Sequence, residues 1–266
     1  MPRGDLRLSF PPPVKGLKTD APAYLVGEEF FTDGQNVVVR DNAIRVRPGY
    51  VDFGAATGLT DQAAGAISFK DNAENDFLFV CSLTKVKEWN GTAFADRTGV
   101  PNLTGTTANP MRLTTYQTNS TTYVIGTNNV DVPQKLVPGS NRASLAGSPP
   151  SAARDVTVAF NRVIFGNCVI GGTRGPSTLL ISAANNGESY PALNRVDLTD
   201  TNDSIVAVRA LNTQSFAIYK DNSQWIGVGT PNVFPFTFEI RSQTPGPVSP
   251  SAVIAAYGVH FYLAQD

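Results

Sequence analysis

The chain has 266 residues, and its 41% hydrophobic content is sufficient for one large domain or two smaller ones. Charged residues make up 16% of the chain, below the ~25% of typical soluble domains. The net charge of −1 argues against a dedicated nucleic-acid-binding protein, which normally has a basic face. No segment approaches the ~18 apolar residues of a membrane-spanning helix, and no signal-peptide run opens the sequence. The protein is therefore expected to be made in a cytosol and not to enter a membrane.

Residues 1–32 are predicted to form an extended N-terminal arm. The triplet Pro11-Pro12-Pro13 favours a polyproline conformation and cannot enter the interior of a sheet. Such an arm either packs on a neighbouring subunit or is a disordered terminus, and the sequence does not separate the two. The Arg-Gly-Asp triplet at Arg3–Asp5 is short enough to arise by chance, so we do not expect it to bind an integrin.

The next segment is predicted to be a β-hairpin. Two β-rich runs, Gln35–Arg40 and Ala43–Arg47, flank Asp41-Asn42, a pair well suited to a two-residue turn. A solitary hairpin is marginal in water. This hairpin is therefore expected to join a larger sheet.

After the hairpin, one form of segment recurs along the chain. A short run of apolar and aromatic residues, often followed by Gly, Asn or Asp, starts at residues 77, 122, 162, 215 and 259. The spacings are 45, 40, 53 and 44 residues, and strand-rich repeats of ~40–50 residues are typical of β-propeller blades. The runs are Phe77–Ser82, Thr122–Asn128, Arg162–Cys168, Ser215–Asp221 and Val259–Asp266.

Each of the first four repeats is predicted to contain four strands, as one propeller blade does. The first should contain Gly65–Phe69, Phe77–Cys81, Val86–Trp89 and Phe94–Arg97, and the second Met111–Tyr116, Thr122–Ile125 and a weaker pair around Val130–Val137. The third should contain Val156–Phe160, Arg162–Phe165, Leu179–Ala183 and a poorly defined strand near Arg195–Leu198. The fourth is the clearest, with Ile205–Leu211, Phe216–Lys220, Gln224–Val228 and Phe236–Ile240.

The fifth repeat offers only two strands, Ala252–Tyr257 and Val259–Ala264, before the sequence ends. The N-terminal hairpin supplies two strands without a partner. We therefore expect an all-β propeller of about five four-stranded blades over residues 33–266, in which the hairpin completes the fifth blade and removes its open edge. The alternative is that Asp266 is an end created by truncation. In the closed ring, the hairpin's arginines would form an exposed face in preference to a DNA contact; they are Arg40, Arg45 and Arg47.

No catalytic, cofactor-binding or metal-ligating residue is predicted. The single histidine, His260, lies in an apolar strand, and no GxSxG elbow accompanies it. Asp197–Asp203 is the densest run of oxygen ligands, but it lacks the EF-hand glycine and glutamate, so an acidic turn is favoured over a calcium site. The run Gly171–Pro176 is predicted to be a connecting loop and not a phosphate loop.

The remaining candidate side chains are predicted to be structural. Cys81 and Cys168 lie in apolar runs and are expected to be buried free thiols. Trp89 and Trp225 occupy third-strand positions, where an aromatic residue that packs between blades is expected. The alternative role for the two tryptophans is stacking on a sugar ring.

The hairpin text DGQNVVVRDNAIRVRPGYVDFG, the segment KVKEWNGTAFADRTG and the ending AYGVHFYLAQD resemble virion structural proteins of tailed double-stranded DNA phages. The most similar are the propeller-bearing tail nozzle or tail-hub proteins of short-tailed phages. The resemblance covers residues ~30–266 and is most specific in the hairpin and in the Trp89-Asn90-Gly91 turn. It implies subunits arranged in a ring, usually of six, around the DNA exit channel. This chain ends where such proteins commonly continue.

The expectation is therefore a non-enzymatic phage tail component, assembled in the host cytoplasm and located in the virion. Its partners would be further copies of itself and other tail proteins such as an adaptor, fibres or spikes, with DNA only in passage. The alternative function is a propeller that binds or cleaves host surface glycans through Trp89, Trp225, tyrosines and an acidic pair.

Overall fold

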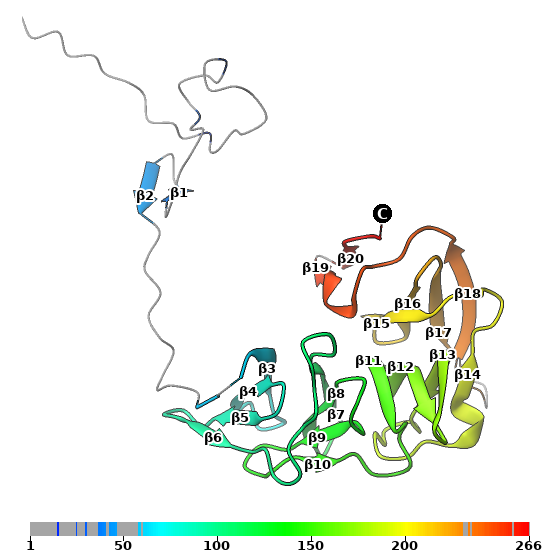
Figure 1. Cartoon of the computed structure of the whole chain (residues 1–266), viewed down its shortest axis with the longest axis horizontal. Coiled ribbons are helices and arrows are strands. Elements are labelled where there is room, and N and C mark those ends of the chain that lie inside the picture. Colours follow the sequence, from blue (N-terminus) through cyan, green and yellow to red (C-terminus); the bar gives the residue numbers. More distant parts are fainter. Residues whose placement is uncertain are drawn as a thin grey trace, which may run out of the picture. The chain divides into compact units, whose positions relative to one another are not determined.

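The described residues fold into antiparallel β-sheets in a computed structural model of the protein (Figure 1). The structure describes residues 61–230, 236–256 and 258–265, the backbone of residues 37–40 and 43–46, and the single residues 15, 25, 30, 58, 59 and 234. The chain divides into two units, Met1–Phe53 and Gly54–Asp266. The boundary expected after residue 32 stays a prediction, and the polyproline and Arg-Gly-Asp triplets of the arm lie outside the described residues.

The predicted hairpin is confirmed in the first unit. Strand β1 (Val37–Arg40) pairs antiparallel with β2 (Ala43–Val46), and Arg40 lies opposite Ala43. Two residues therefore remain for the turn, as the sequence indicated. Arg47 and the side chains of both strands lie outside the described residues, so the exposed arginine face stays a prediction.

The described residues of the second unit form four four-stranded meanders and one two-stranded sheet. The first sheet consists of β3 (Ala63–Lys70), β4 (Asp76–Ser82), β5 (Val86–Trp89) and β6 (Phe94–Asp96), and the second of β7 (Arg112–Gln117), β8 (Thr122–Thr127), β9 (Gln134–Leu136) and β10 (Ala143–Ser144). The third consists of β11 (Ala152–Ala159), β12 (Arg162–Ile170), β13 (Thr173–Ile181) and β14 (Arg195–Asp197), and the fourth of β15 (Ile205–Asn212), β16 (Ser215–Lys220), β17 (Gln224–Gly229) and β18 (Phe236–Ser242). The terminal sheet is β19 (Val253–Ala256) with β20 (Val259–Tyr262), and two 3-10 turns are η2 (Ala192–Asn194) and η3 (Pro250–Ala252).

Successive sheets contact one another through their first strands. Strand β3 contacts β7, β7 contacts β11, β11 contacts β15, and β15 contacts η3 just before the terminal sheet. Each space between consecutive sheets holds its own cluster of buried side chains, such as Phe79 with Val124, Tyr123 with Phe165, and Ile164 with Phe216. Sheets that stack face to face through their first strands are the arrangement of propeller blades.

The five repeated runs of the sequence are the second strands of the five sheets. They form β4, β8, β12, β16 and β20, whose starts lie at residues 76, 122, 162, 215 and 259. In the second, third and fourth sheets the second strand lies inside its sheet and is largely buried, so most of its residues are apolar. Every residue of β16 is buried, for example. The repeated apolar runs therefore mark the second strand of each sheet.

Two strand predictions were wrong in detail. The weak pair around Val130–Val137 contains only β9, and the fourth strand of the second sheet is β10, at Ala143–Ser144. The run Gly171–Pro176 is not a six-residue loop: Gly171 and Gly172, both with positive φ, form a two-residue turn, and β13 begins at the next residue. Pro176 is accommodated in β13 because the β12–β13 register shifts between Gly166 and Cys168, where the ladder needs no amide from it.

Candidate functional site

A buried ion-pair cluster joins the first strands of three sheets. Asp155 of β11 is 1% exposed, and its carboxylate receives hydrogen bonds from Arg209 Nη1 and from the Val208 amide, the latter at 2.9 Å. Arg112 of β7 lies beside it, with Nε 3.7 Å from the second carboxylate oxygen. Burial raises the pKa of Asp155, and the two guanidinium groups oppose this effect. One carboxylate thus holds β7, β11 and β15 together.

The same arginines also hold the connection that leads into the terminal sheet. Arg209 Nη2 donates to the Pro250 carbonyl at 2.5 Å, and Arg112 donates to the Ser251 hydroxyl at 2.5 Å and to the Pro250 carbonyl at 3.3 Å. Because Pro250 and Ser251 lie in η3, the cluster extends from three consecutive sheets to the connection that leads into the terminal sheet. The cluster therefore ties the first strands of these sheets to the connection, although Arg112 Nε makes no hydrogen bond among the described residues.

In the structure both ring nitrogens of His260 have hydrogen-bond partners in neighbouring strands. Its Nε2 donates to the Ala210 carbonyl at 3.0 Å, so in the neutral ring Nδ1 accepts a hydrogen bond from the Tyr219 hydroxyl at 2.8 Å. Tyr219 also packs against Tyr262, and burial raises its pKa to about 12. These contacts fix β20 against β15 and β16.

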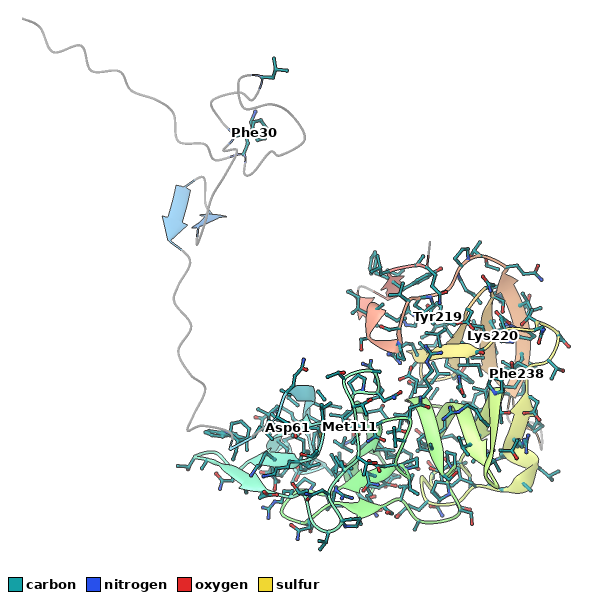
Figure 2. All side chains as sticks on the ribbon, viewed as in Figure 1. Phe30, Asp61, Met111, Tyr219, Lys220 and Phe238 are labelled. Carbon is teal, nitrogen blue, oxygen red and sulfur yellow. The ribbon has the colours of Figure 1, made fainter. Side chains whose placement is uncertain are left out.

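The acidic run Asp197–Asp203 sends its carboxylates to different protein partners. Asp197 receives a hydrogen bond from the Thr178 hydroxyl and pairs with Arg195. Asp203 pairs at 2.8 Å with Lys220, which is 0% exposed and lies next to Tyr219 on β16 (Figure 2). The favoured interpretation, a turn and not a calcium loop, agrees with this geometry.

The Asp203–Lys220 pair should make stability depend on pH in the acid range. Burial alone would raise the pKa of Asp203, but hydrogen bonds from Lys220 and from its neighbours outweigh it and lower the pKa to about 2, from 3.8. The pair therefore contributes fully above pH ~4, and its contribution is lost as the pH falls through 2. We expect a loss of about 2 kcal/mol of unfolding free energy from this group, measured by urea unfolding between pH 5 and pH 2. A flat profile over this interval would contradict the assignment.

The tryptophans and cysteines have packing roles. Trp225 is buried between the third and fourth sheets, with its indole nitrogen donating to the Ser223 hydroxyl at 3.1 Å, so it is not accessible to a sugar ring. Trp89 is half-buried and packs against Phe94, with ring centroids 5.1 Å apart. Cys81 and Cys168 are free and buried, as predicted, and burial raises the pKa of both thiols to about 12, which makes them unreactive.

A cavity of about 580 Å³ opens at the end of the second unit that carries the turns between first and second strands. Tyr123 forms part of its wall, with its ring between Tyr116 and the ammonium group of Lys135, which lies 4.5 Å from the ring centroid. The rest of the lining is mostly uncharged and polar: Asn72, Ala73, Thr118, Ser120, Thr121, Thr122, Val137, Pro138, Asn185, Asn186 and Gly187. Amide and hydroxyl groups beside aromatic rings are suited to polar, neutral ligands.

The two acidic residues of this cavity are already engaged. Glu188 pairs with Lys135 at 2.6 Å. Asp71 accepts hydrogen bonds from the amides of Ala73 and Asn75, and the bond from the Asn75 side chain is the main cause of its lowered pKa. A glycoside-cleaving acid needs a raised pKa, so the cavity is better suited to binding than to cleavage.

The terminal sheet has an exposed apolar face. His260 and Tyr262 of β20 point towards the fourth sheet, so alternation places Val259 and Phe261 on the opposite face, where they are 50% and 53% exposed. Ile254 lies opposite Phe261 in the ladder and is 61% exposed. The second strand of the terminal sheet, β20, therefore has an exposed apolar face, unlike the second strands β8, β12 and β16.

The first sheet also has a face without a neighbouring sheet among the described residues. Ile67 and Phe79 point towards the second sheet, and the opposite face carries Leu78 and Val80, cross-strand from Trp89 and Lys87. Leu78, Val80 and Trp89 are each only partly buried. The two partly uncovered apolar faces therefore belong to the first and last sheets of the series.

No known protein family model matches this sequence. No curated protein matches it either. Among the residues that the structure describes, no helix has the length and apolar character needed to cross a membrane, and no group of three His, Cys, Asp or Glu side chains is placed to hold a metal.

The ion-pair cluster and the cavity were not predicted from the sequence. Asp155, Arg112 and Arg209 are separated by 43 and 54 residues, and only the pairing of strands brings them together. The available signal was a charged residue inside each of three first strands. The cavity is assembled from turns of three different sheets, and such turns are composed of the same residues whether or not they enclose a space.

Proposed function

We propose that this chain is a non-enzymatic structural component of a phage tail, folded as a five-bladed propeller that its own N-terminal hairpin closes. The observation that carries the proposal is the terminal sheet. Its second strand repeats the buried strands β4, β8, β12 and β16 in sequence, yet it has an unpaired edge and exposed apolar side chains within the described chain. A strand of this kind is built to be covered.

The order of strands supports the hairpin as the missing half of the terminal sheet. In each complete sheet the chain leaves the fourth strand and enters the first strand of the next sheet. If β1 and β2 are the third and fourth strands of the terminal sheet, the passage from β2 to β3 follows the same rule. Sixteen residues separate β2 from β3, and fifteen separate β6 from β7, so the connection has an ordinary length for this fold.

The uncovered faces support closure of the ring. With the hairpin added to β20, the face that carries Ile254, Val259 and Phe261 would meet the face of the first sheet that carries Val80 and Trp89. Burying one such large apolar side chain contributes about 1.5–3 kcal/mol. Closure would give Trp89 the packing role between blades that its third-strand position suggested.

The tail assignment rests on the resemblance of the hairpin and turn text to nozzle and hub proteins, together with the low charge content. A near-neutral chain would let DNA pass without strong binding, since neutralisation of phosphates by Lys and Arg is what creates affinity. In this proposal the subunits form a ring, with six the expected number. The ring contacts an adaptor, fibres or spikes, and the protein is located in the virion after assembly in the host cytoplasm.

The test is made on phage particles from the genome that encodes the chain. Mass spectrometry of gradient-purified virions should detect the protein at several copies per particle, and negative-stain images of the purified protein should show rings. A strictly monomeric protein that is absent from virions would overturn the tail assignment, while leaving the hairpin closure to be tested separately.

A second candidate function, glycan binding, is favoured by the cavity beside Tyr123. The expected sugar contacts of Trp225 are excluded by its burial, so any sugar would meet tyrosine, Lys135 and amide groups instead. A glycan array with the intact protein tests this, with Asn186→Ala as the variant in the cavity and Asn212→Ala outside it as the matched control. Equal signals from both variants would exclude the cavity as the binding site.

A further inference from the structure

A second cavity, of about 290 Å³, lies between β7, β11 and the connection that leads to η3. Two arginines line it, Arg112 and Arg154, and none of the lining residues is acidic. The other lining residues are small, polar or proline, apart from Val248.

Positive charge exceeds negative charge at this place. Asp155 is the one carboxylate of the ion-pair cluster, and it already faces both Arg209 and Arg112. Arg112 Nε is buried and makes no hydrogen bond among the described residues. A further arginine, Arg174, donates to the side chain and to the backbone carbonyl of Asn129 on the cavity wall. A partly desolvated excess of guanidinium groups is costly unless an anion compensates it.

Arg154 is the arginine with free donors. Arg154 is half-buried and lines the cavity, and its side chain makes no hydrogen bond or ion pair with any residue that the structure describes. Its neighbour Asp155 points to the other face of β11, as strand alternation requires. The planar fork of a guanidinium group suits an oxyanion, which accepts two parallel hydrogen bonds from it.

We infer that this cavity binds a small inorganic oxyanion, with phosphate as the probe, through Arg154 and Arg112. The hydroxyls of Ser249 and Ser251 and the side chains of Asn109 and Asn129 line the same cavity and can donate further hydrogen bonds to the anion. A bound anion would contact β7, β11 and the β18–β19 connection at once, so it would hold the connection to the terminal sheet against the centre of the sheet series. The cavity has room for a free anion. It has no room for double-stranded nucleic acid, whose phosphate groups are covalently fixed in the backbone.

The experiment is a titration of the intact protein with sodium phosphate against sodium chloride at equal ionic strength, followed by calorimetry and by the melting temperature. Phosphate should bind saturably and raise the melting temperature, whereas chloride should not. Arg154→Gln should weaken phosphate binding about tenfold or more. Arg154→Lys keeps the charge and loses the planar guanidinium group, so its affinity should lie between those of the wild type and Arg154→Gln. Arg241→Gln, an exposed arginine paired with Glu239, is the matched control and should bind as the wild type does.

Two further results decide the inference. A single-stranded oligonucleotide with a 5′ phosphate should bind no better than one without it if the site takes free anions; a clear preference for the 5′ phosphate would assign the site to nucleic-acid ends and overturn the inference. The absence of saturable phosphate binding to the wild type, or equal binding by the wild type and Arg154→Gln, would also overturn it. The wild-type titration decides the matter even if the variants fold poorly.

Discussion

Replacing Asp155 with alanine should lower the free energy of unfolding by about 3–5 kcal/mol, because the change leaves two partly buried guanidinium groups without their counter-charge. The carboxylate also caps the Val208 amide, which would lose its acceptor. Urea unfolding followed by tryptophan fluorescence measures the effect. Asp155→Asn retains an acceptor for the amide and should cost less than alanine.

The matched control for this variant is an exposed ion pair on the same unit. Glu239→Ala removes the partner of Arg241, and both side chains are largely exposed, so a change below about 1 kcal/mol is expected. A cost for Asp155→Ala that does not exceed the control would show that the cluster does not hold the first strands together.

Replacing Lys220 with methionine is expected to cost about 3 kcal/mol or more. Methionine fills a similar volume, but Asp203 is left as an uncompensated carboxylate in a mostly buried position. The Leu198 and Thr201 carbonyls, which accept from Lys220 Nζ at 3.0 and 2.9 Å, also lose their donor. In the variant, the free energy of unfolding should no longer show the fall expected from Asp203 as the pH is lowered from 4 to 2. Equilibrium unfolding at each pH measures this.

Lys70→Met is the control for that variant. Lys70 pairs with Glu74 and Asp76 at the surface, and its side chain is more than half exposed. Its replacement should leave both the stability and its acid dependence nearly unchanged. If Lys220→Met behaves like Lys70→Met, the buried pair is not a determinant of stability.

The parts of the fold that the sequence predicted are those with a strong hydrophobic signal. Second strands such as β16 could be found because burial on both faces favours a continuous apolar run, as in residues 216–219. The hairpin could be found because a two-residue turn requires particular residues between two β-rich runs. Both signals are local, so one sequence is sufficient to detect them.

The outer strands carry a weaker signal. Strand β10 has two residues, Ala143 and Ser144, both exposed, and it pairs with one neighbour only. Nothing in its composition separates it from a loop. The start of β13 was mistaken for a loop because glycine and proline mark turns in most contexts, whereas here Pro176 occupies an irregular part of the ladder.

The candidate sites could not be predicted because they depend on distant pairings. A charged residue inside a strand, such as Asp155 or Lys220, is compatible with either a solvent-facing or a buried position until the neighbouring sheets are placed. Arg112 and Arg209, the partners of Asp155, lie far from it along the chain. Asp203, by contrast, lies close to its partner Lys220. The register of strands and the order of sheets, and not local sequence, bring the charges together.

The hairpin closure is tested most directly by disulfide trapping. A cysteine is placed at each position of β1 in turn, together with a cysteine at Val259 of β20, while the buried native thiols stay in place. If β1 pairs with β20, one register brings the two Cα atoms within the ~4.4–6.8 Å that a disulfide needs. Closure by the hairpin predicts one strong disulfide within a single chain under mild oxidation, identified by peptide mass spectrometry. Only links between chains, or none at any position, would contradict it.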